Sequence, residues 1–150
     1  YYNDGKKEGV VFEVTPDGRH GKIVSMTQCF LSWAIERTEK KRLIGADSWT
    51  DGSVNMDVVK AINGWQYKYP AFGWCANLGE GWYLPAIEEL KVVYKNRNKL
   101  NSKLTDTLAN AYWSSTERNN FCACTVLRRD GYTDYSYKNN KFYIRAVAKF

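Results

Sequence analysis

The sequence predicts an α+β fold in which helices pack on a mainly antiparallel sheet. β-forming residues with turn signals occupy both ends of the chain, in residues 10–26 and 112–149. Apolar residues at helical spacing are instead confined to the middle. This order is typical of α+β domains, and no repeat or low-complexity linker divides it. We therefore expect one domain over residues 1–150, with the N-terminal and C-terminal strands close together in one sheet.

The first element is a hairpin. Val10–Val14 is a run of β-forming residues, and Thr15–Gly18 contains the Pro, Asp and Gly that favour a turn. The chain then returns through residues 20–26, which include Ile, Val and Met. These two runs are predicted to pair as antiparallel strands.

The middle of the chain predicts three helices. The first is capped by Ser53 and ends near Gly64, because apolar residues between them recur at helical spacing. The second starts at Pro70, which fits the first turn of a helix. The third starts at Pro85, and two early glutamates lie where the helix dipole favours anions. Residues 96–110 are polar with three leucines at helical spacing, so we expect a loop with a helical piece.

Strands complete the chain, predicted at residues 112–117, 122–129, 132–137 and 142–149, with Asp130-Gly131 as a tight turn. Side chains alternate along a strand, so about half of the tyrosines in the third strand should point into the core. The side chains that we expect to point outward are Tyr132, Asp134 and Ser136.

The charge is uneven along the chain. The formal net charge is +6, and residues 118–150 contain seven Lys or Arg against two Asp, a local +5. This favours an acidic partner. Nucleic acid is not expected, because no basic helical face or nucleic-acid motif occurs. No apolar run reaches the ~18 residues that a membrane span needs, and we expect no signal peptide within residues 1–150.

The four cysteines do not predict a metal site. Cys29, Cys75, Cys122 and Cys124 form no Cys-x-x-Cys pair, and His20 is the single histidine. Zinc needs about four such ligands in a fixed spacing. We expect no metal and no cofactor.

Three segments carry a family resemblance: Gly81–Leu90 (GWYLPAIEEL), Tyr112–Glu117 (YWSSTE) and Tyr143–Val147 (YIRAV). In this order they resemble the C-terminal domain of bacterial collagen-like adhesins, a branch of the C-type lectin-like fold related to formylglycine-generating enzymes. Asp17–Val24 also resembles the start of such domains in surface proteins of gut anaerobes. The resemblance implies a monomeric binding domain, the C-terminal part of a longer protein that is exported to the cell surface of a Gram-negative bacterium.

The chain is also similar to the variable proteins of diversity-generating retroelements, which randomise adenine-rich codons near the 3′ end of a gene. Asn, Tyr, Asp, Ser and Cys are frequent outcomes, and they cluster after Glu117. The resemblance implies that residues 118–141 display a face that binds a protein or glycan, with an anionic ligand suited to the charge. The candidate display positions are Asn119, Asn120, Cys122, Cys124, Leu127, Arg129, Tyr132, Asp134, Ser136, Asn139 and Asn140.

Several of these residues have both a binding and a structural interpretation. Tyrosines offer large contact area at low rotamer entropy, as in antibody loops, and Lys138 and Lys141 add charge together with Arg128 and Arg129. Asn-rich turns such as Asn119-Asn120, however, also serve turn geometry alone.

The residues before this region have structural interpretations. Trp113 is expected in the core, because the tryptophan of this motif belongs to the scaffold. Glu117 is expected either to satisfy buried backbone groups or to pair with Arg145, since an inward arginine needs a partner.

Two other functions stay open. A thiol enzyme of the formylglycine-generating type would use Cys122 or Cys124, although no histidine lies nearby in sequence to activate either thiol. A structural subunit of a surface assembly would self-associate. The motifs of calcium-dependent lectins are not found in the sequence, so bound calcium is not expected.

Overall fold

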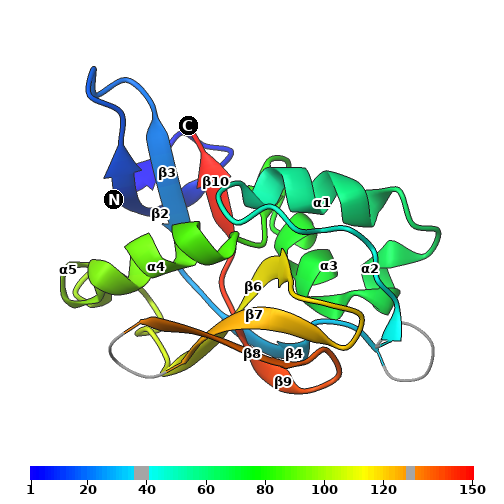
Figure 1. The fold of residues 1–150 in the computed structure, drawn as a ribbon. Coiled ribbons are helices and arrows are strands. Elements are labelled where there is room, and N and C mark those ends of the chain that lie inside the picture. The colour runs from blue at the N-terminus through cyan, green and yellow to red at the C-terminus, as the bar shows by residue number, and fades with distance from the viewer. Residues whose placement is uncertain (36–40, 128–130) are drawn as a thin grey trace.

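The structure is a computed structural model that describes residues 1–35, 41–127 and 131–150 (Figure 1). The predicted α+β class is confirmed, with most strands antiparallel. Its helices in these residues are α1 Gly52–Lys60, α2 Trp65–Lys68, α3 Pro70–Asn77, α4 Ile87–Lys95 and α5 Arg97–Asn101.

The first of two sheets joins the two ends of the chain. Its strand order is β1-β2-β3-β10-β5, and every pairing is antiparallel. The predicted hairpin is confirmed, with Val10 opposite Val24, and Ile23 lies opposite Ala148. The N-terminal and C-terminal strands therefore meet, as expected. The strands are β1 Tyr2–Asn3, β2 Glu8–Val14, β3 Gly21–Ser25, β5 Trp82–Tyr83 and β10 Val147–Lys149.

The second sheet has the order β4-β9-β6-β7-β8, with β6 and β9 parallel. The expectation of a single sheet is wrong, because the predicted strand 142–149 divides between the two sheets. Its break falls at Arg145, whose buried side chain binds backbone carbonyls, and at Ala146, which exchanges hydrogen bonds with Ser25. The strands are β4 Cys29–Ser32, β6 Ala111–Glu117, β7 Cys122–Leu127, β8 Tyr132–Tyr137 and β9 Lys141–Ile144.

The helices begin close to where the sequence places them. α3 begins at Pro70 as predicted, and α5 is the helical piece expected in the polar stretch. The cap of α1 is Asp51 rather than Ser53, because the Asp51 carboxylate accepts from the Ser53 N–H at 3.0 Å. The first residue of α1 packs closely against the segment before α4: a Cβ on Gly52 would stand 2.2 Å from the Leu84 carbonyl oxygen.

Aromatic rings fill the core between the sheets and helices. Trp33 makes edge contacts with Tyr69 and Phe72, with ring centroids 5.7 and 5.2 Å apart. Trp113 is fully buried, as expected, and packs edge-on against Phe142. Helix α4 packs on β6 and β7 and also contacts β2, so it bridges the two sheets (Figure 1).

Candidate ligand-binding face

The tyrosines of β8 are all exposed. Tyr132 is 73% exposed, Tyr135 51% and Tyr137 63%. The expectation that about half of them would be buried is wrong. β8 is the last strand of its sheet, so among the described strands it has a neighbour, β7, on one side only.

The register of β8 on β7 divides its side chains between two faces. Asp134 lies opposite Thr125, and Tyr135 lies opposite Cys124. Paired residues in an antiparallel sheet project to the same face, and side chains alternate along a strand. One face of β8 therefore carries Tyr132, Asp134 and Ser136, and the other face carries Thr133, Tyr135 and Tyr137.

The structure contradicts the display assignment of Cys122 and Cys124. Both side chains are buried, and Cys124 packs in a cluster with Leu90 of α4 and Tyr112. They lie on the sheet face that α4 covers, which the sequence pattern did not reveal. Burial raises the pKa of the Cys124 thiol, and a thiol held protonated is a poor nucleophile at neutral pH.

In the asparagine turns, side chains are exposed to solvent, and one of them also stabilises its turn through hydrogen bonds. Asn119 and Asn120 are exposed in the β6–β7 turn. The Asn119 side chain accepts from the N–H groups of Phe121 and Cys122, at 2.9 and 2.8 Å. The turn interpretation therefore holds for Asn119, while Asn120 is exposed beside it.

The remaining display positions differ in exposure. Asn140 is exposed, and its carbonyl accepts from the Trp113 indole at 3.2 Å. Leu127 and Asn139 are half-buried. Arg129, like Arg128, lies outside the described residues.

A hollow of about 280 Å³ opens where β8 ends. Its lining residues in the described part of the chain come from three separate segments. They are Phe121 from the β6–β7 turn, Tyr137 and Asn139 from the end of β8 and the turn after it, and Lys41 from the segment before α1. Two rings, an amide and an ammonium group therefore meet at one end of the second sheet. Phe121 and Lys41 were not among the predicted site residues, since neither stands out in the sequence.

A buried ion pair involves Lys138, which lies in the chain between Tyr137 and Asn139, two lining residues of this hollow. The Lys138 ammonium is 2.7 Å from a carboxylate oxygen of Glu117 and 2.8 Å from the Arg42 carbonyl oxygen, and it lies 4.9 Å from the centre of the Trp33 ring. Lys138 is fully buried, so its assignment as a surface charge is wrong. Burial lowers the pKa of Lys138, and the hydrogen bond to Glu117 opposes that shift.

Glu117 has the structural role that was one of its two expected interpretations. Its carboxylate accepts from the backbone N–H groups of Ile44 and Gly45, each at 2.9 Å. It therefore holds residues 42–45 against β6. The alternative pairing with Arg145 is wrong, because Glu117 pairs with Lys138 instead.

Arg145 is buried without a carboxylate partner among the described residues. Its guanidinium donates to the carbonyl oxygens of Ser25 at 2.7 Å, Met26 at 3.1 Å and Asp106. A further hydrogen bond of 3.3 Å reaches the Tyr112 hydroxyl. The partner that an inward arginine needs is therefore supplied by the dipoles of backbone carbonyls.

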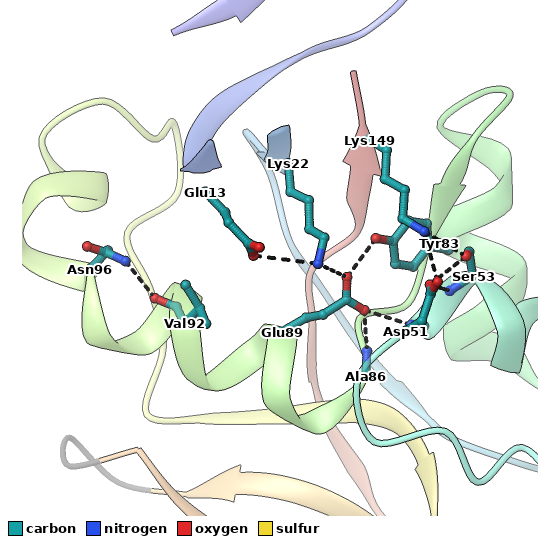
Figure 2. Close-up of polar contacts among 11 residues, drawn as sticks. Glu13, Lys22, Asp51, Ser53, Tyr83, Ala86, Glu89, Val92, Asn96 and Lys149 are labelled. Atoms are coloured by element: carbon teal, nitrogen blue, oxygen red, sulfur yellow. Dashed lines mark hydrogen bonds and ion pairs between the residues drawn. The ribbon is translucent and has the colours of Figure 1, made fainter. Parts of the chain in front are cut away.

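A second polar cluster surrounds Glu89 of α4, whose side chain points toward residues of the first sheet (Figure 2). The Glu89 carboxylate accepts from the Gly52 N–H at 2.7 Å, the Ala86 N–H at 3.1 Å and the Tyr83 hydroxyl at 2.7 Å. One side chain thus satisfies donors at the N-termini of α1 and α4. A glutamate three residues after the cap of α4 is the signal that could have predicted this role.

The cations of this cluster already have carboxylate partners. Lys22 lies 3.1 Å from Glu89 and 3.5 Å from Glu13, and Lys149 lies 2.9 Å from Asp51 (Figure 2). Lys22, Lys149 and His20 line a hollow of about 310 Å³ next to this cluster. The cluster joins helices to the first sheet, and its paired charges give it a structural role.

The geometry defines a scaffold with buried polar clusters and an exposed edge strand, β8. In residues 1–35, 41–127 and 131–150, no group of three His, Cys, Asp or Glu side chains could hold a metal ion. Within the same residues no helix is long and apolar enough to cross a membrane.

Comparisons with known proteins place the chain in a family. Residues 22–148 match the family model of the Lcl C-terminal domain, and the chain belongs to this family. The crystal structure of a fimbrial protein from Bacteroides ovatus ATCC 8483 is similar, with a TM-score of 0.68 and 18% identity. That similarity covers 87% of this chain and 36% of the fimbrial protein's chain, so this chain spans about a third of its length. A search of curated proteins finds no match.

Proposed function

We propose that the chain is a non-enzymatic binding domain of C-type lectin-like fold, displayed on the surface of a Gram-negative bacterium. It recognises a protein or glycan through the exposed side chains among residues 118–127 and 131–141, which occupy both sides of the edge strand β8 and the turns beside it. We call these exposed side chains the binding face. The observation that carries this proposal is the edge strand β8, whose three tyrosines are 51% to 73% exposed although large rings are usually buried. Membership of the Lcl C-terminal domain family and the adhesin resemblance support it.

The charges near this face favour an anionic ligand. Arg118 and Lys141 are exposed, and the Arg118 guanidinium lies 4.4 Å from the centre of the Tyr135 ring. Asp134 is the exposed carboxylate among the described residues of β8. Sulfated glycans would suit this balance of charge.

Diversification by a retroelement is the finer form of this proposal. It applies to the exposed positions Asn120, Tyr132, Asp134 and Asn140, and it no longer includes the buried cysteines. The gene tests it directly. Adenine-rich codons at these positions and a neighbouring reverse transcriptase gene are expected, and finding neither would remove this part.

An array of glycans and host proteins tests the binding proposal. The wild type should bind a defined set, and Tyr132→Ala and Tyr137→Ala should lose signal on it. Tyr67→Ala is the matched control, because Tyr67 in α2 is 66% exposed but lies outside the face. If Tyr132→Ala and Tyr137→Ala both gave the wild-type profile, as the control should, the face would be wrongly assigned.

A structural subunit of a surface assembly is the second candidate. The likeness to a fimbrial protein and the free edge of β8 favour it. Light scattering after size-exclusion chromatography separates the two functions. A binding domain is expected to be a monomer at tens of micromolar. Oligomers that form as the concentration rises, and that the Tyr135→Ala substitution converts to monomers, would favour the assembly function.

A further inference from the structure

Two of the four cysteines lie in neighbouring elements of the core, although they are far apart in the sequence. Cys29 is the first residue of β4, and Cys75 lies in α3. Helix α3 packs on β4, and both cysteines belong to the same apolar cluster (Figure 1). Cys75 is fully buried, Cys29 is half-buried, and both are free thiols. The fold therefore brings two thiols that no binding role uses into one packed layer.

The pairing of β4 directs the Cys29 side chain toward the core. Cys29 lies opposite Ile144 of β9, which is fully buried. Residues that are paired across an antiparallel sheet project to the same face, so Cys29 shares the buried face with Ile144. The next residue, Phe30, lies opposite Tyr143, and both of these rings are exposed on the other face.

Helix α3 presents Cys75 to the same layer. Phe72 and Cys75 are three residues apart, so they lie on one side of the helix, and both are fully buried. Phe72 makes an edge contact with Trp33, the residue after β4, with ring centroids 5.2 Å apart. Burial raises the pKa of the Cys75 thiol, and the nearby Cys29 thiol raises it further. The two side chains thus approach each other from β4 and from α3.

The other two cysteines do not suit a disulfide bond. Cys122 and Cys124 are two residues apart on β7, which separates their parallel side chains by about 6.5 Å. A disulfide needs Cβ atoms about 3.5–4.5 Å apart. Strands β6 and β9 lie between β7 and β4, and Cys124 packs in a separate cluster against α4. Cys29 and Cys75 are therefore the cysteines that the fold can join.

We propose that Cys29 and Cys75 form a disulfide bond that ties α3 to β4 after the chain is exported. The pairing follows from the fold alone, and only the compartment rests on the proposed function. Disulfides persist in oxidising compartments outside the cytoplasm and are reduced inside it. The bond closes a long loop that contains α1 and α2, and a cross-link over a long loop restricts the unfolded chain most.

The bond forms by two exchanges with a donor disulfide, such as that of an oxidoreductase or of oxidised glutathione. The Cys29 thiolate attacks one donor sulfur, which forms a mixed disulfide and releases the other donor sulfur as a thiolate. The Cys75 thiolate then attacks the Cys29 sulfur and releases the second donor thiolate. The two cysteine protons pass to the donor thiolates, so the cysteines are oxidised by two electrons and the donor is reduced to two thiols.

The burial of Cys75 decides when the bond forms. Its raised pKa keeps the folded thiol protonated at neutral pH, and a protonated thiol is a poor nucleophile. In the unfolded chain the same thiol is exposed to the donor. The bond should therefore form while the chain folds, and the folded, reduced protein should oxidise much more slowly.

Oxidative refolding of the whole chain tests the pairing. The reduced, denatured chain is diluted into a mixture of reduced and oxidised glutathione, the remaining thiols are alkylated, and the protein is digested without reduction. Mass spectrometry should find one linked peptide pair that contains Cys29 and Cys75, with Cys122 and Cys124 alkylated. Alkylation of all four cysteines, or a link between any other two, would overturn the proposal.

Thermal melting tests whether the bond stabilises the fold. The oxidised chain should melt about 10 °C above the chain refolded with dithiothreitol. Cys29→Ala should abolish this difference, because it removes one of the two sulfur atoms. Cys122→Ala is the matched control and should keep it. Equal melting temperatures of the oxidised and reduced wild type would show that α3 and β4 are not tied by the bond.

The compartment is tested separately from the pairing. Cells that produce the natural protein are lysed in an alkylating agent, and the chain is digested as before. The Cys29–Cys75 link should be present. If the link forms in glutathione but the cellular protein carries both thiols alkylated, export is wrong while the pairing stands. Full array binding by Tyr132→Ala and Tyr137→Ala would instead remove the binding face and leave the disulfide unaffected.

Discussion

The buried polar residues of this domain and its exposed face use the same residue types in opposite ways. We call the buried set the frame: Glu117, Lys138, Arg145 and the buried tyrosines Tyr83, Tyr94 and Tyr112. Lys138 is fully buried against Glu117, whereas Lys141, three residues later, is exposed. Tyr112 is fully buried beside Arg145, whereas Tyr132 is 73% exposed. The identity of a residue therefore does not decide its role here. Its position relative to the sheet edge and its partners do.

The difference has an energetic consequence. Breaking a buried ion pair leaves an uncompensated charge, which costs roughly 3–5 kcal/mol, whereas an exposed charge contributes about 0–1 kcal/mol. Substitutions in the frame should thus change the free energy of unfolding, and substitutions on the face should change binding. The following predictions test this separation.

Arg145→Ala should have the largest effect. It removes the donor for the carbonyls of Ser25, Met26 and Asp106 and leaves a large cavity, so the free energy of unfolding should fall by roughly 3–5 kcal/mol. Urea denaturation followed by tryptophan fluorescence measures it. Lys141→Ala is the control and should stay within about 0.5 kcal/mol. An unchanged midpoint for Arg145→Ala would contradict its structural role.

Glu117→Gln should destabilise the protein by about 3 kcal/mol, because Lys138 would remain buried without its counter-charge. Lys138→Met alone should also destabilise, since it leaves the carboxylate unpaired. The double variant should be more stable than the sum of the two single losses, with a coupling of about 1–3 kcal/mol. Additive losses in this double-mutant cycle would mean that the pair is not coupled.

Alkaline pH should unfold the frame. Burial raises the pKa of Tyr83, Tyr94 and Tyr112, while the unfolded chain loses these protons near pH 10. Their contribution is complete below pH 10 and is lost as pH rises toward the folded values, by about 1.4 kcal/mol per pH unit for each tyrosine. The pKa of Lys138 is lowered in the folded protein, so the titration of this one group raises the free energy of unfolding as pH rises and opposes the effect of the tyrosines.

Unfolding free energies between pH 9 and 11.5 measure this effect. Tyr94→Phe should reduce the slope above pH 10 by the share of one tyrosine. Tyr132→Phe, a change on the exposed face, should leave the slope unaltered. A slope that responds equally to both variants would contradict the distinction between frame and face.

Tyr132→Ala should have the smallest effect on stability, within about 0.5 kcal/mol, because its side chain is 73% exposed. Binding to any ligand found on the array should nevertheless weaken by tenfold or more if Tyr132 is a contact residue. Thermal melting and titration on the same sample measure both quantities. A loss of stability without a loss of binding would move Tyr132 from the face to the frame.

Local chemistry made much of the fold predictable. The hairpin around Thr15–Gly18 and the start of α3 at Pro70 follow from turn residues and proline geometry, which act within a few neighbours. The burial of Trp113 was expected from the family resemblance. The capping role of Glu89 could also have been predicted, because a glutamate three residues after a helix cap is a local sequence signal. The strand positions in the last third were also close to those observed.

Long-range pairing decided what the sequence did not. The break at Arg145 depends on carbonyls more than a hundred residues away, and the burial of Cys124 depends on where α4 packs. β8 exposes all its tyrosines because it is the edge strand. The alternation of side chains along a strand predicts which residues share a face, but it does not predict the order of the strands in the sheet. The sequence by itself determined the elements and the region rich in contact residues. Only the tertiary structure decided which of those side chains face solvent, because burial is a property of neighbours that folding brings together.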